Sequence, residues 1–218
     1  MQEIPLFPLN TVLFPGMPLT LHIFEERYKL MMTECIEKRE PFGVALIANN
    51  KTDTNPNAIP HRVGCTAQIT RVQPLQEGRM EITAVGRERF EVISLDQAQP
   101  YLIGKIQMLP LKEDNPIQLL HLGQQLRKNV AAYLTILRSM GKINFDSSQL
   151  PQSPMALGYL SAVLLQSPLK DKQSLLCAAS AKEFLEFLYA TYNREIALLN
   201  VMRDPPTTLD YYNTYSLS

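Results

Sequence analysis

Apolar side chains in the first half of the chain recur in short runs of the kind that form β-strands. Residues 4–9 and 17–24 are the first two runs, and the second alternates apolar with polar positions. Between them lies Phe14–Pro18, with the sequence FPGMP, which we predict to be a turn because Pro restricts the backbone and Gly adopts positive φ freely. The pattern therefore predicts a sheet that starts near the N-terminus.

Residues 25–39 change to a helical period. Tyr28 and Met32 are spaced as on one face of a helix. Glu25 and Lys29 have the same spacing on the exposed side, where we expect them to form an ion pair. This segment is predicted to be the one helix of the first half.

Four further strands are predicted before about Leu111, at residues 42–48, 64–74, 80–95 and 101–109. Gly86, in the sequence GRERF, interrupts the third of these and predicts a bulge that bends the sheet. The stretch 49–60 is rich in Asn and Pro and is predicted to be an exposed loop. About six strands with one helix favour a small barrel.

After Pro110 the period becomes helical. Helices are predicted at residues 116–140, 154–166, 171–179 and 180–202. Asn115 is a suitable N-cap, Gly141 a suitable C-terminal stop, and Ser180–Glu183 has the form of a capping box. The predicted α+β organisation is a β-barrel subdomain over 1–111, an α-helical bundle subdomain over 112–204 and a C-terminal tail over 205–218.

The charge balance argues against binding through long-range electrostatics. The 218 residues include 21 basic and 21 acidic side chains, so the net charge is zero. A protein that binds nucleic acid or an anionic membrane in this way is usually strongly basic. No signal peptide is visible, and no apolar run approaches the ~20 residues of a membrane span. We therefore expect a soluble cytoplasmic protein, with nucleic acid disfavoured as a partner and no membrane partner.

The sequence contains no familiar catalytic, cofactor or metal motif. Its glycines have neither the GxxxxGK[ST] nor the GxGxxG spacing, and a GxSxG nucleophile elbow is absent. The three histidines and three cysteines show no metal-ligand spacing, and the cysteines, at 35, 65 and 177, are expected to be reduced and mostly buried. We expect no catalytic residue, no cofactor and no metal.

One cluster of basic residues requires a separate interpretation. The four arginines at positions 71, 79, 87 and 89 lie on two predicted neighbouring strands and their turn. They are candidates for a phosphate-binding strip. Four glutamates, at 77, 81, 88 and 91, are interleaved with them, and we favour solvent-facing ion pairs that nearly cancel the field.

Six motifs in order carry a resemblance to a known family. They are IPLFPLNTVLFPGMPLTLHIFEERYKLM at 4–31, FGVALI at 42–47, VGCTAQI at 63–69, GRERFEVI at 86–93, DKQSLL at 171–176 and REIALL at 194–199. Over about residues 4–202 the chain resembles the stand-alone amino-terminal, substrate-binding domain of Lon proteases. The resemblance implies a six-stranded pseudo-barrel of the PUA-like (pseudouridine-synthase-and-archaeosine) type, followed by a helical bundle. Because the family's ATPase and protease modules are not in this sequence, it implies binding of unfolded or tagged proteins without proteolysis.

Recognition of extended chains requires accessible apolar side chains beside a strand edge or groove. The protein-binding candidates are Phe14, Pro15 and Met17 in the turn, and Leu30 and Met31 in the helix, which lie off its main apolar stripe. The alternative for the helix is that it packs on two sides and buries both.

Three functions remain open from the sequence. The first is a non-catalytic adaptor for unfolded or tagged polypeptides, working with a separate protease, and an apolar strip would serve homo-oligomer formation equally well. The second is an RNA-binding PUA-like module, which the charge balance argues against. The third is an enzyme of unrecognised type with a polar cluster between barrel and bundle.

Overall fold

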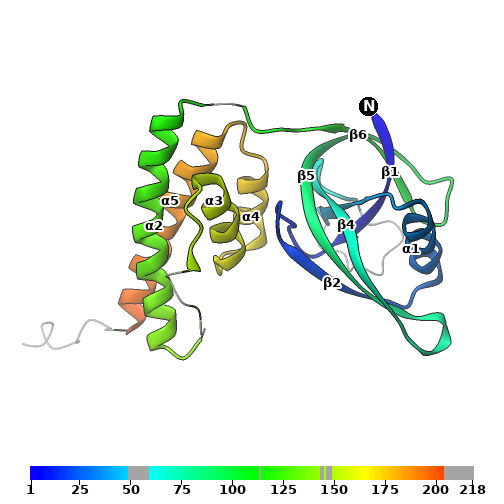
Figure 1. The fold of residues 1–218 in the computed structure, drawn as a ribbon, viewed down its shortest axis with the longest axis horizontal. Coiled ribbons are helices and arrows are strands. Elements are labelled where there is room, and N and C mark those ends of the chain that lie inside the picture. The colour runs from blue at the N-terminus through cyan, green and yellow to red at the C-terminus, as the bar shows by residue number, and fades with distance from the viewer. Residues whose placement is uncertain (49–58, 113, 143–144, 146–148, 204–218) are drawn as a thin grey trace, which may run out of the picture.

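Two lobes lie side by side in the computed structural model, a strand-rich barrel and a helical bundle (Figure 1). The structure describes residues 1–48, 59–112, 114–142, 145 and 149–203. Most of the predicted loop 49–60 and the whole predicted tail 205–218 lie outside these residues. The predicted α+β fold of pseudo-barrel and bundle is confirmed.

A single sheet contains six strands in the described residues. They are β1 (Gln2–Leu9), β2 (Pro18–Ile23), β3 (Phe42–Leu46), β4 (Val63–Pro74), β5 (Met80–Asp96) and β6 (Leu102–Met108). Their order is β2-β5-β4-β3-β1-β6, and β6 also pairs with β5, so five strands close into a ring. The 17-residue strand β5 makes this possible, because its first part pairs with β2 and its last part with β6.

Large side chains and glycines together fill the inside of the ring. Leu6, Phe90 and Ile106 are fully buried there. A Cβ atom at Gly104 would lie 2.5 Å from Leu6 Cδ1, and one at Gly64 would lie 2.5 Å from Phe90 Cζ. Small residues therefore leave the space that the large ones occupy, as a narrow barrel requires.

Helix α1 (Glu26–Lys38) covers the outside of the barrel. Its buried residues are Tyr28, Met31, Met32 and Cys35. The predicted Glu25–Lys29 ion pair is wrong: Lys29 Nζ donates instead to Glu26 Oε1 at 2.8 Å and to the carbonyl of Glu77 at 3.1 Å. The lysine thus ties the helix to the tip of the β4–β5 hairpin.

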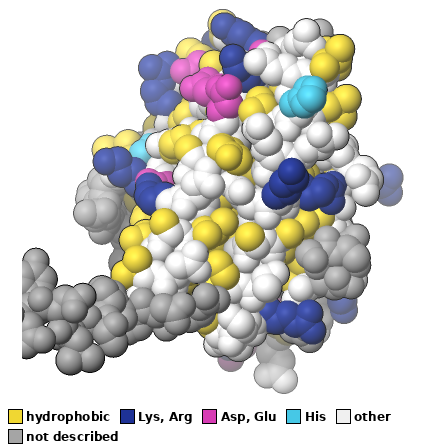
Figure 2. All heavy atoms as spheres, turned by 90° about the vertical axis from the view of Figure 1, so that its left-hand side faces the viewer, with side chains coloured by type: hydrophobic (Ala, Val, Ile, Leu, Met, Phe, Trp, Pro, Cys, Tyr) yellow, Lys and Arg dark blue, Asp and Glu magenta, His cyan; other side chains and the backbone are white. Residues whose placement is uncertain are grey.

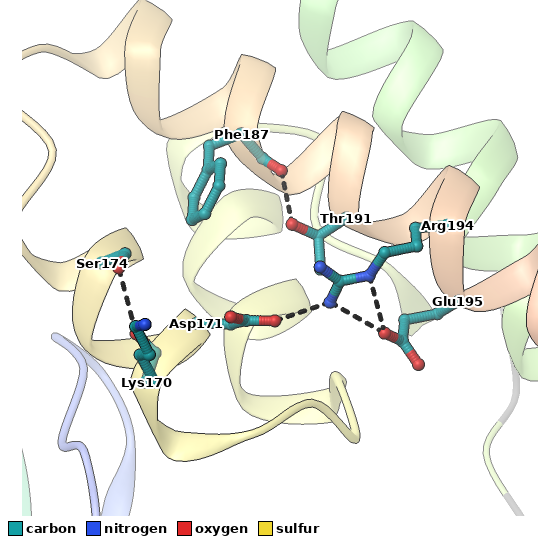
Figure 3. A network of polar contacts seen from close by, with 7 residues as sticks. All are labelled: Lys170, Asp171, Ser174, Phe187, Thr191, Arg194 and Glu195. Atoms are coloured by element: carbon teal, nitrogen blue, oxygen red, sulfur yellow. Dashed lines mark hydrogen bonds and ion pairs between the residues drawn. The ribbon is translucent and has the colours of Figure 1, made fainter.

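The bundle contains α2 (Pro116–Ser139), α3 (Pro154–Leu164), α4 (Leu169–Leu176) and α5 (Ala181–Arg203). Asn115 Oδ1 caps α2 by accepting from Ile117 N at 2.9 Å, as predicted. The capping box of α5 differs by one residue, because the Glu183 carboxylate accepts from Ala179 N rather than from Ser180 N. Side chains also join α4 to α5, where Arg194 bonds to Asp171 (Figure 3).

Barrel and bundle share a buried joint. Phe14 belongs to the apolar cluster of the bundle, together with Val12 and Leu46 from the barrel. Arg89 is 5% exposed, and its Nη1 donates to the carbonyls of Leu176 and Ala178, each at 2.7 Å. These carbonyls end α4, where the helix dipole favours a cation. The prediction that Arg89 belongs to a solvent-facing strip is therefore wrong.

Candidate protein-recognition surface

The turn predicted to contact clients lies between the two lobes. Gly16 N donates to Gly86 O at 2.8 Å, and Gly86 N donates to Met17 O at 2.9 Å. Phe14 is 1% exposed and packs into the bundle, so the expectation that it is accessible is wrong. Pro15 and Met17 are half-buried, and Met17 packs against the cores on both sides. This turn joins barrel to bundle.

The two candidates on α1 have opposite environments. Met31 is fully buried beneath the helix, so the expectation that it leaves apolar surface uncovered is wrong, and the packed alternative holds for it. Leu30 is 45% exposed, because it lies on the face of the helix opposite Tyr28 and Met32. The structure does not bring Leu30 together with the residues of the turn.

Strand β2 has an unpaired edge. Among the described strands it pairs with β5 alone, over residues 18–23. Thr20 and His22 are exposed, while Leu19 and Leu21 are half-buried. An exposed edge offers a row of backbone N–H and C=O groups to a further strand. This geometry permits an extended peptide to add to the sheet.

An apolar hollow lies beside this edge. Its volume is about 270 Å³, and it is lined by Phe7, Leu9, Leu21, His22, Ile23, Phe24, Glu25 and Tyr28. The rings of Phe7 and Tyr28 have their centroids 4.0 Å apart. Phe24 is 54% exposed just after the end of β2. An unpaired edge and an apolar hollow therefore occur together, which is the combination that strand addition uses.

Charges near the hollow compensate one another. Glu25 and Arg27 form an ion pair at 2.9 Å. The guanidinium of Arg27 also lies over the ring of Tyr28, 4.5 Å from its centroid. Because both charges have local partners, the hollow favours apolar side chains over charged ones.

Phe24 was missed by the sequence reasoning, although the strand pattern contains a signal for it. In β2, Leu19 and Leu21 are half-buried and Ile23 is buried, so Phe24 follows in the phase of the exposed residues. A large aromatic in the exposed phase of an alternating strand is a candidate contact residue.

The arginine strip does not form a continuous basic face. Arg79 pairs with Glu77, and Arg89 is buried, so Arg71 and Arg87 are the two exposed arginines of the strip without an ion pair among the described residues. On the outer face of the bundle, basic and apolar side chains are scattered among polar ones (Figure 2). Neither observation favours a phosphate-binding surface.

The described residues offer no arrangement typical of metal or thiol chemistry. No group of three His, Cys, Asp or Glu side chains within them is placed to hold a metal ion. Burial raises the pKa of Cys35 to about 11 and that of Cys65 to about 12, so both stay protonated at neutral pH. All three cysteines are free, and the predicted burial holds for Cys35 and Cys65 but not for Cys177, which is exposed. No helix in the described part of the chain has the length and apolar character needed to cross a membrane.

A closed pseudo-barrel joined to a helical bundle is the architecture of Lon amino-terminal domains. A Lon N-terminal domain protein from Xanthomonas campestris superposes with a TM-score of 0.62 at 22% identity, over 87% of this chain and 98% of that one. The N-terminal domain of Mycobacterium avium complex Lon protease gives 0.68 at 16% identity, over 88% and 98%.

The sequence comparison specifies the family. The model of the ATP-dependent protease La (LON) substrate-binding domain matches residues 3–193, so the chain belongs to this family. Lon protease of Cytophaga hutchinsonii is 26% identical in an alignment over 213 residues that covers 92% of this chain and 25% of that protein. Lon protease 2 of Myxococcus xanthus is 22% identical over 92% of this chain and 24% of its own length. The chain thus spans about a quarter of these relatives.

Proposed function

We propose that the chain is a non-catalytic module that binds unfolded or tagged polypeptides and presents them, as an adaptor, to a separate protease. The observation that carries this proposal is the unpaired edge of β2 beside its apolar hollow. Membership of the Lon substrate-binding family supports a substrate-recognition role. The match covers the substrate-binding region, not a catalytic module.

In the proposed complex an extended client segment pairs with β2. Backbone hydrogen bonds supply affinity that is independent of sequence, and alternate client side chains supply selectivity. One apolar client side chain enters the hollow above Phe7 and Tyr28, and Phe24 covers it from the rim. A folded protein has few free strands, so this mode selects unfolded or extended segments.

The first experiment measures binding of a fluorescent, permanently unfolded protein at two salt concentrations, with a structured RNA alongside. Saturable binding of the unfolded protein that tolerates salt supports the proposal, because apolar contacts and backbone pairing are weakly screened. Binding of the RNA alone, lost as salt rises, would contradict the proposal and favour the RNA-binding alternative.

A pair of variants locates the site. We expect Phe24→Glu to weaken client binding by roughly tenfold, since it removes about 1–2 kcal/mol of apolar contact. Leu30→Glu is the matched control, because Leu30 is similarly exposed but lies on the outer face of α1. Equal losses in both variants would contradict a site confined to the β2 edge. A second copy of this chain is the other candidate to pair with the β2 edge. Light scattering tests this alternative, because self-pairing would appear as a dimer.

A further inference from the structure

The open end of the barrel holds a cavity that the proposed function does not use. Its volume is about 730 Å³. Its lining comes from the start of β1, the middle of β4 and β5, the end of β6 and the two residues before β3, so four strands of the closed ring contribute directly. Figure 1 shows the chain start, marked N, beside β6 at this end. The mouths of β-barrels are frequent positions of ligand sites.

The alternation of side chains along the strands explains why the cavity ends at an apolar floor inside the ring. Side chains at alternate positions of β1 face the inside of the ring, where Leu6 is fully buried beside Phe90. Above them, Ile4 from β1 and Met108 from β6 provide an apolar floor. Thr66 forms part of the wall and bonds to the backbone of Glu88 through its hydroxyl. The result is an apolar base beneath a polar rim.

The rim carries an excess of negative charge. Glu3, Glu40 and Glu88 contribute three carboxylates, and Arg87 contributes one guanidinium. All four side chains are exposed, and none of them forms an ion pair with another described residue. Elsewhere on the barrel, in contrast, Glu91 pairs with Arg62. The carboxylates of the rim therefore remain available to a cation from outside.

We propose that the mouth of the barrel binds a cationic group on an apolar stem, an ammonium or a guanidinium carried by a Lys or Arg side chain of a polypeptide or by a small amine. The stem lies on Ile4 and Met108, and the charged end meets the carboxylates of the rim. The site is separate from the β2 edge, and neither it nor its test depends on client binding there.

A nuclear magnetic resonance titration of the full, ¹⁵N-labelled chain tests this directly. The probes are lysine capped at both ends, capped norleucine as a stem without charge, and cadaverine as a free diamine. We expect capped lysine to shift the amide signals of Gln68 and Glu88 in a saturable manner, and to leave those of β2 unchanged. Equal affinity for cadaverine assigns the site to small amines as well, whereas a response to capped lysine alone assigns it to polypeptide side chains. Equal binding of norleucine, or no saturable shift with either amine, would overturn the proposal.

Variants test the carboxylates. We expect Glu40→Gln combined with Glu88→Gln to weaken capped-lysine binding by roughly tenfold, and added salt to weaken it in the wild type. Glu81→Gln is the matched control, because Glu81 is an exposed residue of β5 that does not line the cavity. Unchanged affinity in the double variant would contradict the proposal. The norleucine comparison stands without any variant, so the conclusion does not depend on how the substitutions fold.

Discussion

At the scale of single residues, Gly86 and Phe14 determine how closely the turn at residues 14–18 approaches strand β5. A Cβ atom at Gly86 would lie 2.2 Å from the carbonyl oxygen of Phe14, because the turn and β5 exchange two backbone hydrogen bonds. The sequence suggests a bulge at this glycine, and the register of β4 on β5 does shift between Cys65 and Ala67, opposite the segment from Gly86 to Arg89. The glycine thus has a second role, since it lets the turn approach the sheet.

Gly86→Ala should reduce the free energy of unfolding by about 2–4 kcal/mol, since backbone must move to accommodate the methyl group. Gly16→Ala is the matched control, because Gly16 has φ +78° and open space around it. It should cost about 1–2 kcal/mol from backbone strain alone. Urea unfolding curves of both variants measure the difference, and an equal cost would contradict the steric argument.

Buried thiols make the fold sensitive to alkaline pH. Folding raises the pKa of Cys35 and of Cys65, mainly through burial, from 9.0 to about 11 and about 12. Groups with a raised folded pKa stabilise the fold fully below pH 9, and this stability is lost as pH rises from 9 towards those values. Between pH 9 and 10 we expect a loss of about 1 kcal/mol per thiol.

Melting temperatures measured between about pH 8 and pH 10 test this, and a comparison with a variant that lacks both thiols separates their effect from that of tyrosines, which also titrate near pH 10. A Cys35→Ala, Cys65→Ala variant should show a flatter profile than the wild type. Parallel profiles in the two proteins would assign the alkaline sensitivity to other groups.

At the scale of elements, α4 and α5 are joined by side chains from two of the sequence motifs. Arg194 of REIALL donates to Asp171 of DKQSLL at 2.6 Å and to its neighbour Glu195 at 3.0 Å (Figure 3). These contacts raise the pKa of Arg194. The arginine side chain is 52% exposed, so solvent screens the pair.

Arg194→Ala should therefore reduce the free energy of unfolding by at most about 0.5 kcal/mol, and by less at high salt. A double-mutant cycle with Asp171→Ala isolates the pair from the other contacts of each residue. A coupling energy above about 1.5 kcal/mol would show that the network is worth more than its exposure implies.

At the scale of the molecule, we propose that residues 1–111 and 112–204 are subdomains that unfold together. The interface between them contains polar as well as apolar contacts. Gln173 on α4 donates to the carbonyl of Val63 at 2.9 Å, close to the pair of carbonyls that accept from Arg89. Desolvation lowers the pKa of Arg89, and its Nη2 has no hydrogen-bond partner among the described residues, so it is a costly residue to bury.

Arg89→Met should lower the free energy of unfolding by about 2–4 kcal/mol, because two buried carbonyls lose their donor. It should also weaken coupling between the lobes. Helix loss by circular dichroism and exposure of Cys65 by thiol labelling are expected to coincide in the wild type and to separate in the variant. Coincident transitions in both proteins would contradict the proposal that Arg89 couples the unfolding of the barrel to that of the bundle.

The sequence alone determined the order, type and most bounds of the helices and strands. Hydrophobic periodicity and helix caps depend on residues close together in the chain. Neighbouring residues are therefore enough to predict the alternation in β5, the N-cap at Asn115 and the end of α2 near Gly141. The family could also be read from ordered motifs, the first of which is the longest. For the candidate site, the helical spacing correctly predicted that Leu30 is exposed, but it did not predict which residues lie near Leu30 in space.

Only the tertiary structure decided which apolar and charged side chains are hidden. From the sequence, Phe14 and Met31 are candidates for exposed contacts and Arg89 for a solvent-facing strip, but all three are buried by elements far away in the chain. The unpaired edge of β2 and the mouth of the barrel likewise exist only once strands from both ends of the barrel segment have paired. Burial depends on such long-range packing, and a local period does not contain it.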